Sequence, residues 1–135
     1  MLVNNLRASR CNNVVIFTDF TRNNRKHESA LNYFFEEEIE VNMIQRFNKL
    51  AAKWQNETCG LSSITKKITN FNYLKIIAMG KTVVPLILHS LAQQPDHWFV
   101  ALKVLTDQDP TSPNSSFEEA VEAWLSWGKQ EGLID

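Results

Sequence analysis

The sequence predicts an all-α fold, a compact bundle of about five helices. Apolar residues recur at the spacing of one helical turn from His27 to Leu133, which is the pattern of helices that bury one face. Gly and Pro number only four each among 135 residues, which disfavours disorder and many-turned β-sandwiches. A chain of this length forms about one domain and buries a core without covalent staples.

The first predicted helix is the longest and runs from about His27 to Cys59. Gly60 follows it and suits the left-handed position that ends many helices. The glutamates at positions 36–38 and 40 would lie on the face that contacts water. The buried stripe of this helix is predicted to contain Leu31, Phe34, Phe35, Ile39, Ile44, Phe47, Leu50, Ala51 and Trp54.

Two shorter helices are predicted next. Ser62 or Ser63 caps a helix that ends near Thr69, and Asn70 caps a helix that ends at Gly80. Ser and Asn favour these positions because their side chains accept hydrogen bonds from the free N–H groups of a first turn. Such short connections favour antiparallel neighbours.

A fourth and a fifth helix follow from the same kind of signal. Thr82 is the predicted N-cap of the fourth helix, and Pro85 falls in its first turn, where a missing N–H costs nothing. This helix stops before Pro95. Asp96 is the predicted N-cap of the fifth helix, which continues to about Leu105.

The last helix is predicted after a loop at residues 106–116. Ser115 or Ser116 caps it, and Glu118 and Glu119 suit the positive end of the helix dipole. This arrangement fixes where the helix begins. Its predicted buried stripe contains Ala120, Val121, Trp124, Leu125 and Trp127.

The N-terminal segment, residues 1–26, differs from the rest of the chain. It is rich in Asn and Arg, and only residues 14–20 have the β-branched and aromatic composition of a strand. A lone strand is not stable in water, and no second strand follows to pair with it. We therefore divide the chain into a poorly determined segment at 1–26, with a lone strand, and a helical domain at 27–135.

The fourth and fifth predicted helices resemble a HEAT-type helical hairpin. Val84 and Pro85 would start its first helix, whose Leu-rich face continues to Leu91. The paired helix would span residues 96–105, with Ala101 and Leu102 at the point of closest packing. The resemblance covers one repeat, whereas solenoids need about three or more. It therefore implies one HEAT-like hairpin inside a small bundle.

Residues 43–132 also resemble a family of small, uncharacterised bacterial helical proteins. The residues that carry this resemblance are Pro95-Asp96-His97-Trp98-Phe99, Ala101-Leu102, Asp109-Pro110, Trp124-Leu125 and Trp127-Gly128. The resemblance implies a bacterial source and a helical fold. It implies no activity, catalytic residue or cofactor.

The residues themselves suggest neither a catalytic centre nor a cofactor or metal site. His27, His89 and His97 are the only histidines, and none stands three or four positions from another, as helical metal ligands often do. Consecutive glutamates at positions 36–38 fan out around a helix and do not converge. We therefore expect a protein that is not an enzyme.

Positive charge is concentrated between residues 43 and 81, although the net charge of the chain is −1. Arg46, Lys49 and Lys53 share one helix face, which could contact phosphates or an acidic protein surface. Alternatively, the charges solvate the outer face and pair in part with the acidic C-terminal helix. The residues are Arg46, Lys49, Lys53, Lys66, Lys67, Lys75 and Lys81.

Trp98, Trp124 and Trp127 fit the core of such a bundle, where large rings fill the gaps between helices. An exposed ring among them would instead be a hot spot for a partner. The function expected from the sequence is a non-enzymatic protein-interaction module, an adaptor or accessory protein. The alternative is a nucleic-acid-associated accessory protein that uses the basic residues at 43–81.

Location is predicted from two absences in the sequence. The N-terminus has no apolar signal core, and no apolar run approaches the length of about 18 residues that spans a membrane. We therefore expect a cytoplasmic protein without a membrane partner. In that compartment Cys11 and Cys59 would be reduced thiols.

Overall fold

The computed structural model describes residues 30–135, with side chains from Phe35 onward. Within this range the chain forms six α-helices and no strand, so the predicted all-α fold is confirmed. The lone strand predicted at 14–20 and the rest of the segment at 1–26 lie outside the described residues. The elements are α2 (Ala30–Thr58), α3 (Ile64–Ile68), α4 (Phe71–Ala78), the 3₁₀ turn η1 (Lys81–Val83), α5 (Val84–Gln93), α6 (Phe99–Thr106) and α7 (Phe117–Gln130).

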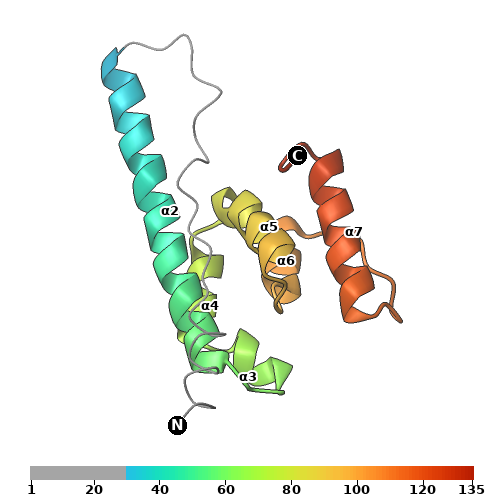
Figure 1. Ribbon diagram of the computed structural model, residues 1–135. Coiled ribbons are helices and arrows are strands. Elements are labelled where there is room, and N and C mark those ends of the chain that lie inside the picture. Colours follow the sequence, from blue (N-terminus) through green and yellow to red (C-terminus); the bar gives the residue numbers. More distant parts are fainter. Residues whose placement is uncertain (1–29) are drawn as a thin grey trace.

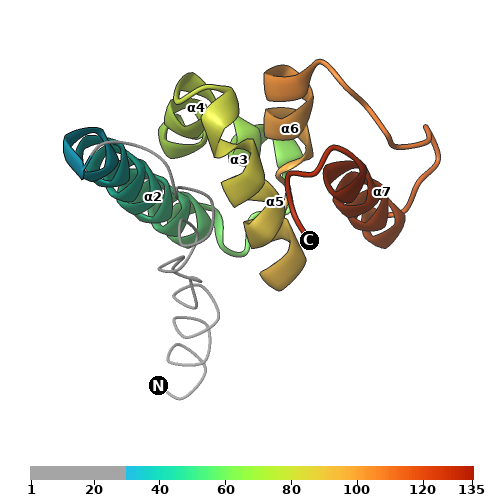
Figure 2. The same ribbon diagram turned by 90° about the horizontal axis from the view of Figure 1, so that it is seen from above.

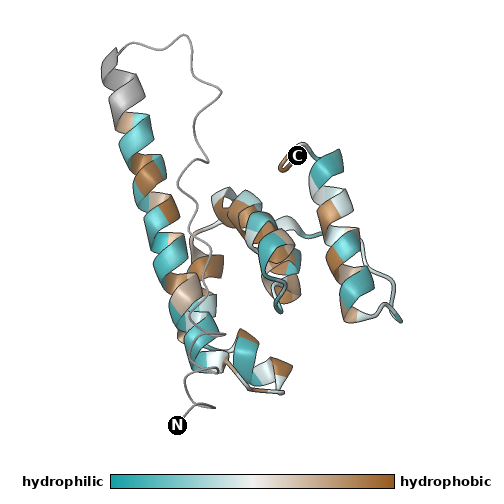
Figure 3. Ribbon diagram, in the orientation of Figure 1, coloured by the Kyte–Doolittle hydropathy of each residue, from teal (hydrophilic) through white to brown (hydrophobic). Residues whose placement is uncertain are grey.

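The helices form a small bundle with α2 and α7 on opposite sides (Figures 1 and 2). Helix α4 packs against α2, and α6 packs against both α4 and α5. Helix α7 packs against α5, while the short α3 contacts α2 and α4. Helices α5 and α6 thus occupy the centre, where apolar residues colour much of the ribbon in Figure 3.

Four aromatic side chains, which we call the aromatic core, join α2, α4 and the start of α6. The ring centroids of Trp54 and Trp98 lie 4.4 Å apart, and those of Trp54 and Tyr73 lie 5.0 Å apart. Phe47 completes the group, with its ring 5.8 Å from that of Trp98. All four side chains are almost completely buried. Trp98 therefore belongs to the core, as its helical spacing predicts.

Tyr73 also ties α4 to α6 through its hydroxyl group. The Tyr73 hydroxyl donates a hydrogen bond to the carbonyl oxygen of His97 and accepts one from the N–H of Ala101, both at 2.9 Å. The Ala101 N–H lies in the first turn of α6, where the helix itself supplies no partner, and the His97 carbonyl directly precedes the N-cap Trp98. The phenol therefore does for α6 what a capping side chain does for other helices.

Three helices begin at predicted caps. The Ser63 hydroxyl accepts a hydrogen bond from the Lys66 N–H, and the Asn70 side-chain carbonyl oxygen accepts one from the Asn72 N–H. Ser116 and Glu119 form a reciprocal capping box at the start of α7. These signals are local in sequence, which is why they predict the structure correctly.

The predicted cap at Thr82 is wrong. Lys81 to Val83 form a 3₁₀ turn after Gly80, whose φ of 88° is in the region that favours glycine. Helix α5 therefore begins at Val84, and its N-cap Val83 makes no side-chain hydrogen bond. Pro85 does lie in the first turn of this helix, as predicted.

The predicted cap at Asp96 is also wrong. Helix α6 begins at Phe99, and its N-cap is Trp98. The Asp96 carboxylate instead accepts a hydrogen bond from the His97 N–H at 2.8 Å and pairs with the Lys67 ammonium at 3.1 Å. An ion pair with a residue of α3, distant in sequence, therefore replaces the local cap.

The apolar stripe of α2 is buried in only part of the helix. Burial begins at Ile44, whereas Phe35 and Ile39 are 68% and 61% exposed. Their predicted place in the core is wrong because the N-terminal half of α2 extends beyond the helices that pack against its C-terminal half (Figure 1). Helical periodicity predicted the helix but not the extent of its packing surface.

Helix α2 ends as predicted, with Gly60 in the left-handed region at a φ of 79°. Cys59, beside this turn, is disulfide-bonded. The expectation of a reduced thiol is therefore wrong for Cys59, and Cys11 lies outside the described residues. No helix in the described part of the chain is by itself long and apolar enough to cross a membrane; α4 and the segment Lys81–Gln93 pass that test only as a pair bent by 105°.

Candidate binding pocket

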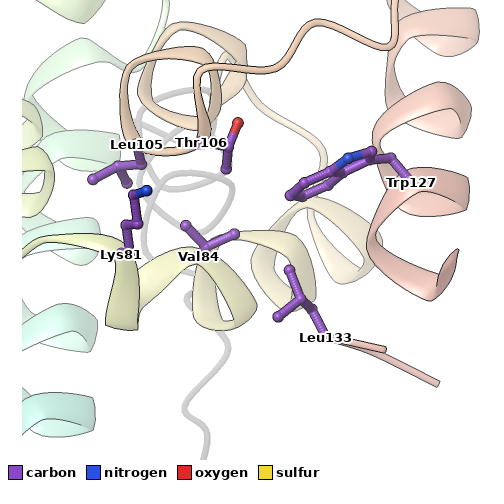
Figure 4. A pocket seen from close by; sticks show the side chains of 6 residues that line it. All are labelled: Lys81, Val84, Leu105, Thr106, Trp127 and Leu133. Atoms are coloured by element: carbon purple, nitrogen blue, oxygen red, sulfur yellow. The ribbon is translucent and has the colours of Figure 1, made fainter. Parts of the chain in front are cut away.

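A pocket of about 220 Å³ opens where the start of α5, the end of α6 and the end of α7 meet (Figure 4). Its walls are predominantly apolar, and a single ammonium group stands among them. The side chains that line it are Lys81, Val84, Leu105, Thr106, Trp127 and Leu133. Three helix ends that are far apart in sequence thus create one concave surface.

The wall formed by Trp127 and Leu133 is built by the way α7 ends. The N–H of Leu133 donates to the carbonyl of Gly128 at 2.9 Å, and the N–H of Gly132 donates to the carbonyl of Lys129 at 3.1 Å. With Gly132 at a φ of 70°, this is a Schellman motif. The motif typically brings an apolar residue after the turn against one in the last helical turn. It therefore holds Leu133 close to Trp127, and both face the pocket.

Gly128 allows α7 and the C-terminal tail to approach α5 closely. A Cβ atom at this position would lie 2.7 Å from Cδ1 of Leu88 and 3.2 Å from Cγ1 of Ile134. Any larger residue at this position would require one of these side chains or the helix itself to shift. Trp124, one turn earlier in α7, is completely buried and packs edge-on against Trp127, with 5.3 Å between their ring centroids. Packing against Trp124 therefore holds the Trp127 ring from one side, while the ring lines the pocket.

The opposite wall comes from the end of α6. The Thr106 hydroxyl donates to the carbonyl of Leu102 at 2.7 Å and accepts a hydrogen bond from the Gln108 N–H at 3.2 Å. Figure 4 shows the hydroxyl pointing away from Val84 and the methyl group toward it. The backbone bonds therefore occupy the polar end of Thr106, and its methyl group is left to line the pocket.

Lys81 supplies the positive charge of the pocket. It is exposed in the 3₁₀ turn before α5, and its side chain extends toward Leu105 and Thr106 (Figure 4). Lys81 makes no ion pair within residues 30–135. The pocket therefore combines an apolar interior with an ammonium group that can meet an anion.

The structure places the seven basic residues predicted as a contact face on four elements. Arg46, Lys49 and Lys53 are exposed on α2. Lys66 is exposed on α3 and Lys75 on α4, while Lys81 stands at the pocket. Lys67 alone is largely covered, because it pairs with Asp96 and both side chains are at most 20% exposed. The three residues on α2 are the ones that share a helix face by their spacing.

The three tryptophans predicted as conditional hot spots have different surroundings. Trp98 and Trp124 are completely buried and offer no surface to a partner. Trp127 is half-buried and lines the pocket. Sequence reasoning missed Val84, Leu105, Thr106 and Leu133 as pocket residues, because only the fold brings them together. The signal that could have found this wall is the glycine at position 132, directly after a helix that carries Trp127.

The Lys67–Asp96 ion pair lies close enough to His97 to act on its pKa. Burial lowers the pKa of His97, with a further lowering from the Lys67 charge and an opposing effect from Asp96. Burial has the opposite effect on Tyr73 and raises the pKa of its hydroxyl group. Hydrogen bonds from Lys103 and Thr111 lower the pKa of Asp109 to about 2. No group of three or more His, Cys, Asp or Glu residues within 30–135 could hold a metal ion.

Comparisons with known proteins assign no family to the chain. No family model, curated protein or solved structure matches it. The resemblances to a HEAT-type hairpin and to the small bacterial proteins therefore remain predictions. What the structure adds to the first of them is that α5 and α6 pack together and that Ala101 and Leu102 are completely buried.

Proposed function

We propose that this protein is a non-enzymatic interaction module, an adaptor or accessory protein, and that its pocket receives an apolar side chain of a protein partner. The observation that carries the proposal is a half-buried Trp127 in an apolar pocket beside Lys81, whose ammonium group has no ion-pair partner among residues 30–135. Interfaces concentrate their binding energy on aromatic residues that meet a partner in such well-packed pockets.

The size of the pocket favours a side chain over a small-molecule ligand. Sites for drug-sized ligands have volumes of roughly 300–1,000 Å³, whereas this pocket has about 220 Å³. One large aliphatic or aromatic side chain fits a space of this order. The rigid wall of Trp127 and Leu133 means that little side-chain freedom is lost when an anchor enters.

Lys81 supports a partner that carries a carboxylate beside its apolar anchor. A charge at the rim of an interface contributes more to orientation and association rate than to affinity. We therefore expect Trp127 to determine whether a partner binds, and Lys81 to determine which sequences around the anchor are preferred.

The resemblances noted in the sequence belong to this proposal. A HEAT-like hairpin would correspond to α5 and α6, and surfaces of HEAT-type repeats bind proteins. The start of α5 and the end of α6 both contribute to the pocket. We accordingly propose that the chain belongs with the small bacterial helical proteins that carry the Trp-x-x-Trp-Gly pattern.

Selection from a displayed library of random peptides tests the proposal. We expect the full chain to enrich peptides with a large apolar residue, and Trp127→Ala to weaken their binding at least tenfold, as is typical of a hot spot. Phe71→Ala is the matched control, because Phe71 is 79% exposed on α4 and lies outside the pocket. Thr106→Met should also weaken binding by filling the pocket. The proposal is overturned if the selected peptides bind the Trp127→Ala variant as tightly as they bind the natural chain.

A nucleic-acid-associated accessory protein remains the second candidate, because Arg46, Lys49 and Lys53 are exposed on one helix. Phosphate contacts weaken steeply as salt rises, since binding releases counterions. If this candidate is correct, nucleic acid should be retained at low salt and lost when the three residues are changed to Glu. Retention that does not change in this triple variant excludes the α2 face as the nucleic-acid contact.

A cytoplasmic location is part of the same proposal. The bond at Cys59 bears on it, because disulfides are rare in reducing compartments. Fractionation of cells that make the full chain tests the location, and recovery of the chain outside the cytoplasmic fraction would contradict it.

A further inference from the structure

The N-terminal half of α2 lacks a packing surface in the described structure. Burial along this helix begins at Ile44, while Phe35, Ile39 and Val41 are 68%, 61% and 40% exposed. Phe35 and Ile39 stand one helical turn apart on the same face of α2, and exposed apolar side chains gathered on one face mark an interface. We propose that α2 pairs in antiparallel orientation with α2 of a second copy of this chain.

Six exposed residues of α2 form a stripe along one face with the spacing of a coiled-coil seam; the first two are apolar, the third is Asn42 and the last three are basic. Successive members stand four, three, four, three and four positions apart, the repeat that keeps one face of a helix against another helix. All of them are exposed. By helical geometry the stripe lies roughly 120° around the helix from the face that α4 covers. Its members are Phe35, Ile39, Asn42, Arg46, Lys49 and Lys53.

The charges along α2 select a second copy in antiparallel orientation. Glu38 flanks the apolar end of the stripe, and the other end is basic. In a parallel pair the basic ends would repel each other. An antiparallel pair centred on Asn42 places Glu38 opposite Arg46, four positions on either side of the centre, and Phe35 opposite Lys49, seven positions on either side.

Each contact then occurs twice, as a two-fold interface requires. The Phe35 ring would pack on the aliphatic stem of Lys49 and meet its ammonium group as a cation–π pair. Asn42 would face its own counterpart on the axis, a position at which coiled coils use Asn to fix register. The complementary surface is thus found on the same helix, which identifies the occupant as this chain itself.

This pairing leaves the pocket open. The pocket is formed by the ends of α5, α6 and α7, and α7 lies on the opposite side of the bundle from α2 (Figures 1 and 2). A dimer would therefore present two pockets, and linked sites bind a multivalent partner more tightly than either site alone. The inference is independent of the proposed pocket function, because its test uses no peptide; it competes with the nucleic-acid candidate, because both use Arg46, Lys49 and Lys53.

Sedimentation equilibrium of the full chain provides the first test. We expect a monomer–dimer equilibrium at micromolar concentrations, weakened about tenfold or more by Glu38→Lys or by Arg46→Glu, because each change replaces two attractions with two repulsions. The double variant Glu38→Lys/Arg46→Glu should restore the dimer. Lys75→Glu is the matched control, an exposed lysine on α4 that is outside the stripe.

Cysteine cross-linking gives the orientation. Under mild oxidation, Asn42→Cys should join two copies through position 42, identified by mass spectrometry of the linked peptides. Phe35→Cys should not join through position 35, because the two sites would lie about 21 Å apart in the antiparallel pair. Self-linking at both positions indicates a parallel pair and overturns the proposal. A chain that stays monomeric at these concentrations also overturns the proposal. So does a dimer that neither charge reversal weakens, because the exposed face of α2 would then bind something other than a second α2.

Discussion

The aromatic core and the pocket are both built around tryptophan, yet one is closed and the other is open. In the aromatic core, Trp98 contacts three other aromatic rings and has no exposed surface. In the pocket, Trp127 packs against one buried ring and leaves the rest of its surface beside a cavity. The same side chain thus stabilises the fold where helices surround it and offers a binding surface where helix ends leave space.

We expect the largest effect from Trp98→Ala. Removal of a completely buried Trp leaves a cavity between α2, α4 and α6, and such changes typically cost about 3–5 kcal/mol of unfolding free energy. Trp127→Ala should cost only about 1–2 kcal/mol, because half-burial shields less apolar area from water. Urea unfolding monitored by circular dichroism measures both. Equal losses of stability would show that the pocket is as much a part of the core as Trp98 is.

Gly128→Ala should affect the boundary between the two regions. The added Cβ would lie 2.7 Å from Leu88 Cδ1, so either the buried Leu88 side chain must change its position or α7 must move away from α5. Overpacking of this kind costs about 1–3 kcal/mol, and the displacement would alter the Trp127 and Leu133 wall of the pocket. Thermal unfolding and the shift of tryptophan fluorescence provide the measurements, because Trp127 is half-buried whereas Trp54, Trp98 and Trp124 are completely buried.

Gly60→Ala separates steric crowding from backbone strain. Gly60 has a positive φ like Gly132, but a Cβ added to it would meet no atom of the described residues within 4 Å. The variant should therefore lose stability through strain, with the tryptophan fluorescence of the folded protein unchanged. A Gly128→Ala protein with the natural stability and fluorescence would mean that α7 does not depend on this close approach.

How far the sequence predicts each region depends on the distance over which its signals act. The helix starts at Ser63, Asn70 and Ser116 follow from side chains that bond their own first turns. Thr82 and Asp96 offered the same signal, but a 3₁₀ turn replaced the first and an ion pair with Lys67 replaced the second. Local chemistry was thus sufficient except where a 3₁₀ turn displaced the helix start or a tertiary ion pair engaged the capping side chain.

The pocket and the exposed end of α2 show the limits of periodicity. A stripe of apolar residues predicts that a helix has a packing face, but not whether another element reaches it, as Phe35 and Ile39 demonstrate. Leu105, Thr106 and Leu133 come from one helix end and the tail, so no spacing along the chain connects them. Trp127 was identified only as a residue whose role would depend on its exposure.

The edge of the aromatic core should give stability a dependence on pH. Burial lowers the pKa of His97 below its usual value of 6.5, so the unfolded chain binds a proton more readily than the folded chain. Stability should therefore be complete above the unfolded pKa and should fall as the pH drops from about 7 toward 5. His97→Gln should flatten this part of the profile in urea titrations at several pH values. A His97→Gln profile that falls as steeply as that of the natural chain would assign the dependence to other groups.

The smallest effect is expected at the start of the loop beside the pocket. Lys103 on α6 pairs with Asp109 at 2.7 Å, but their side chains are 43% and 47% exposed. Water and salt screen such pairs, so Asp109→Asn should change the unfolding free energy by less than about 1 kcal/mol despite a pKa of about 2 for this carboxyl. Because that pKa is lowered, the contribution is present above the unfolded value and is lost only as the pH falls through about 2. A double-mutant cycle with Lys103→Met isolates the contribution of the pair. If Asp109→Asn costs much more unfolding free energy at neutral pH, and costs nothing when Lys103 is already Met, the ion pair stabilises the pocket side of the molecule as Trp98 stabilises the core.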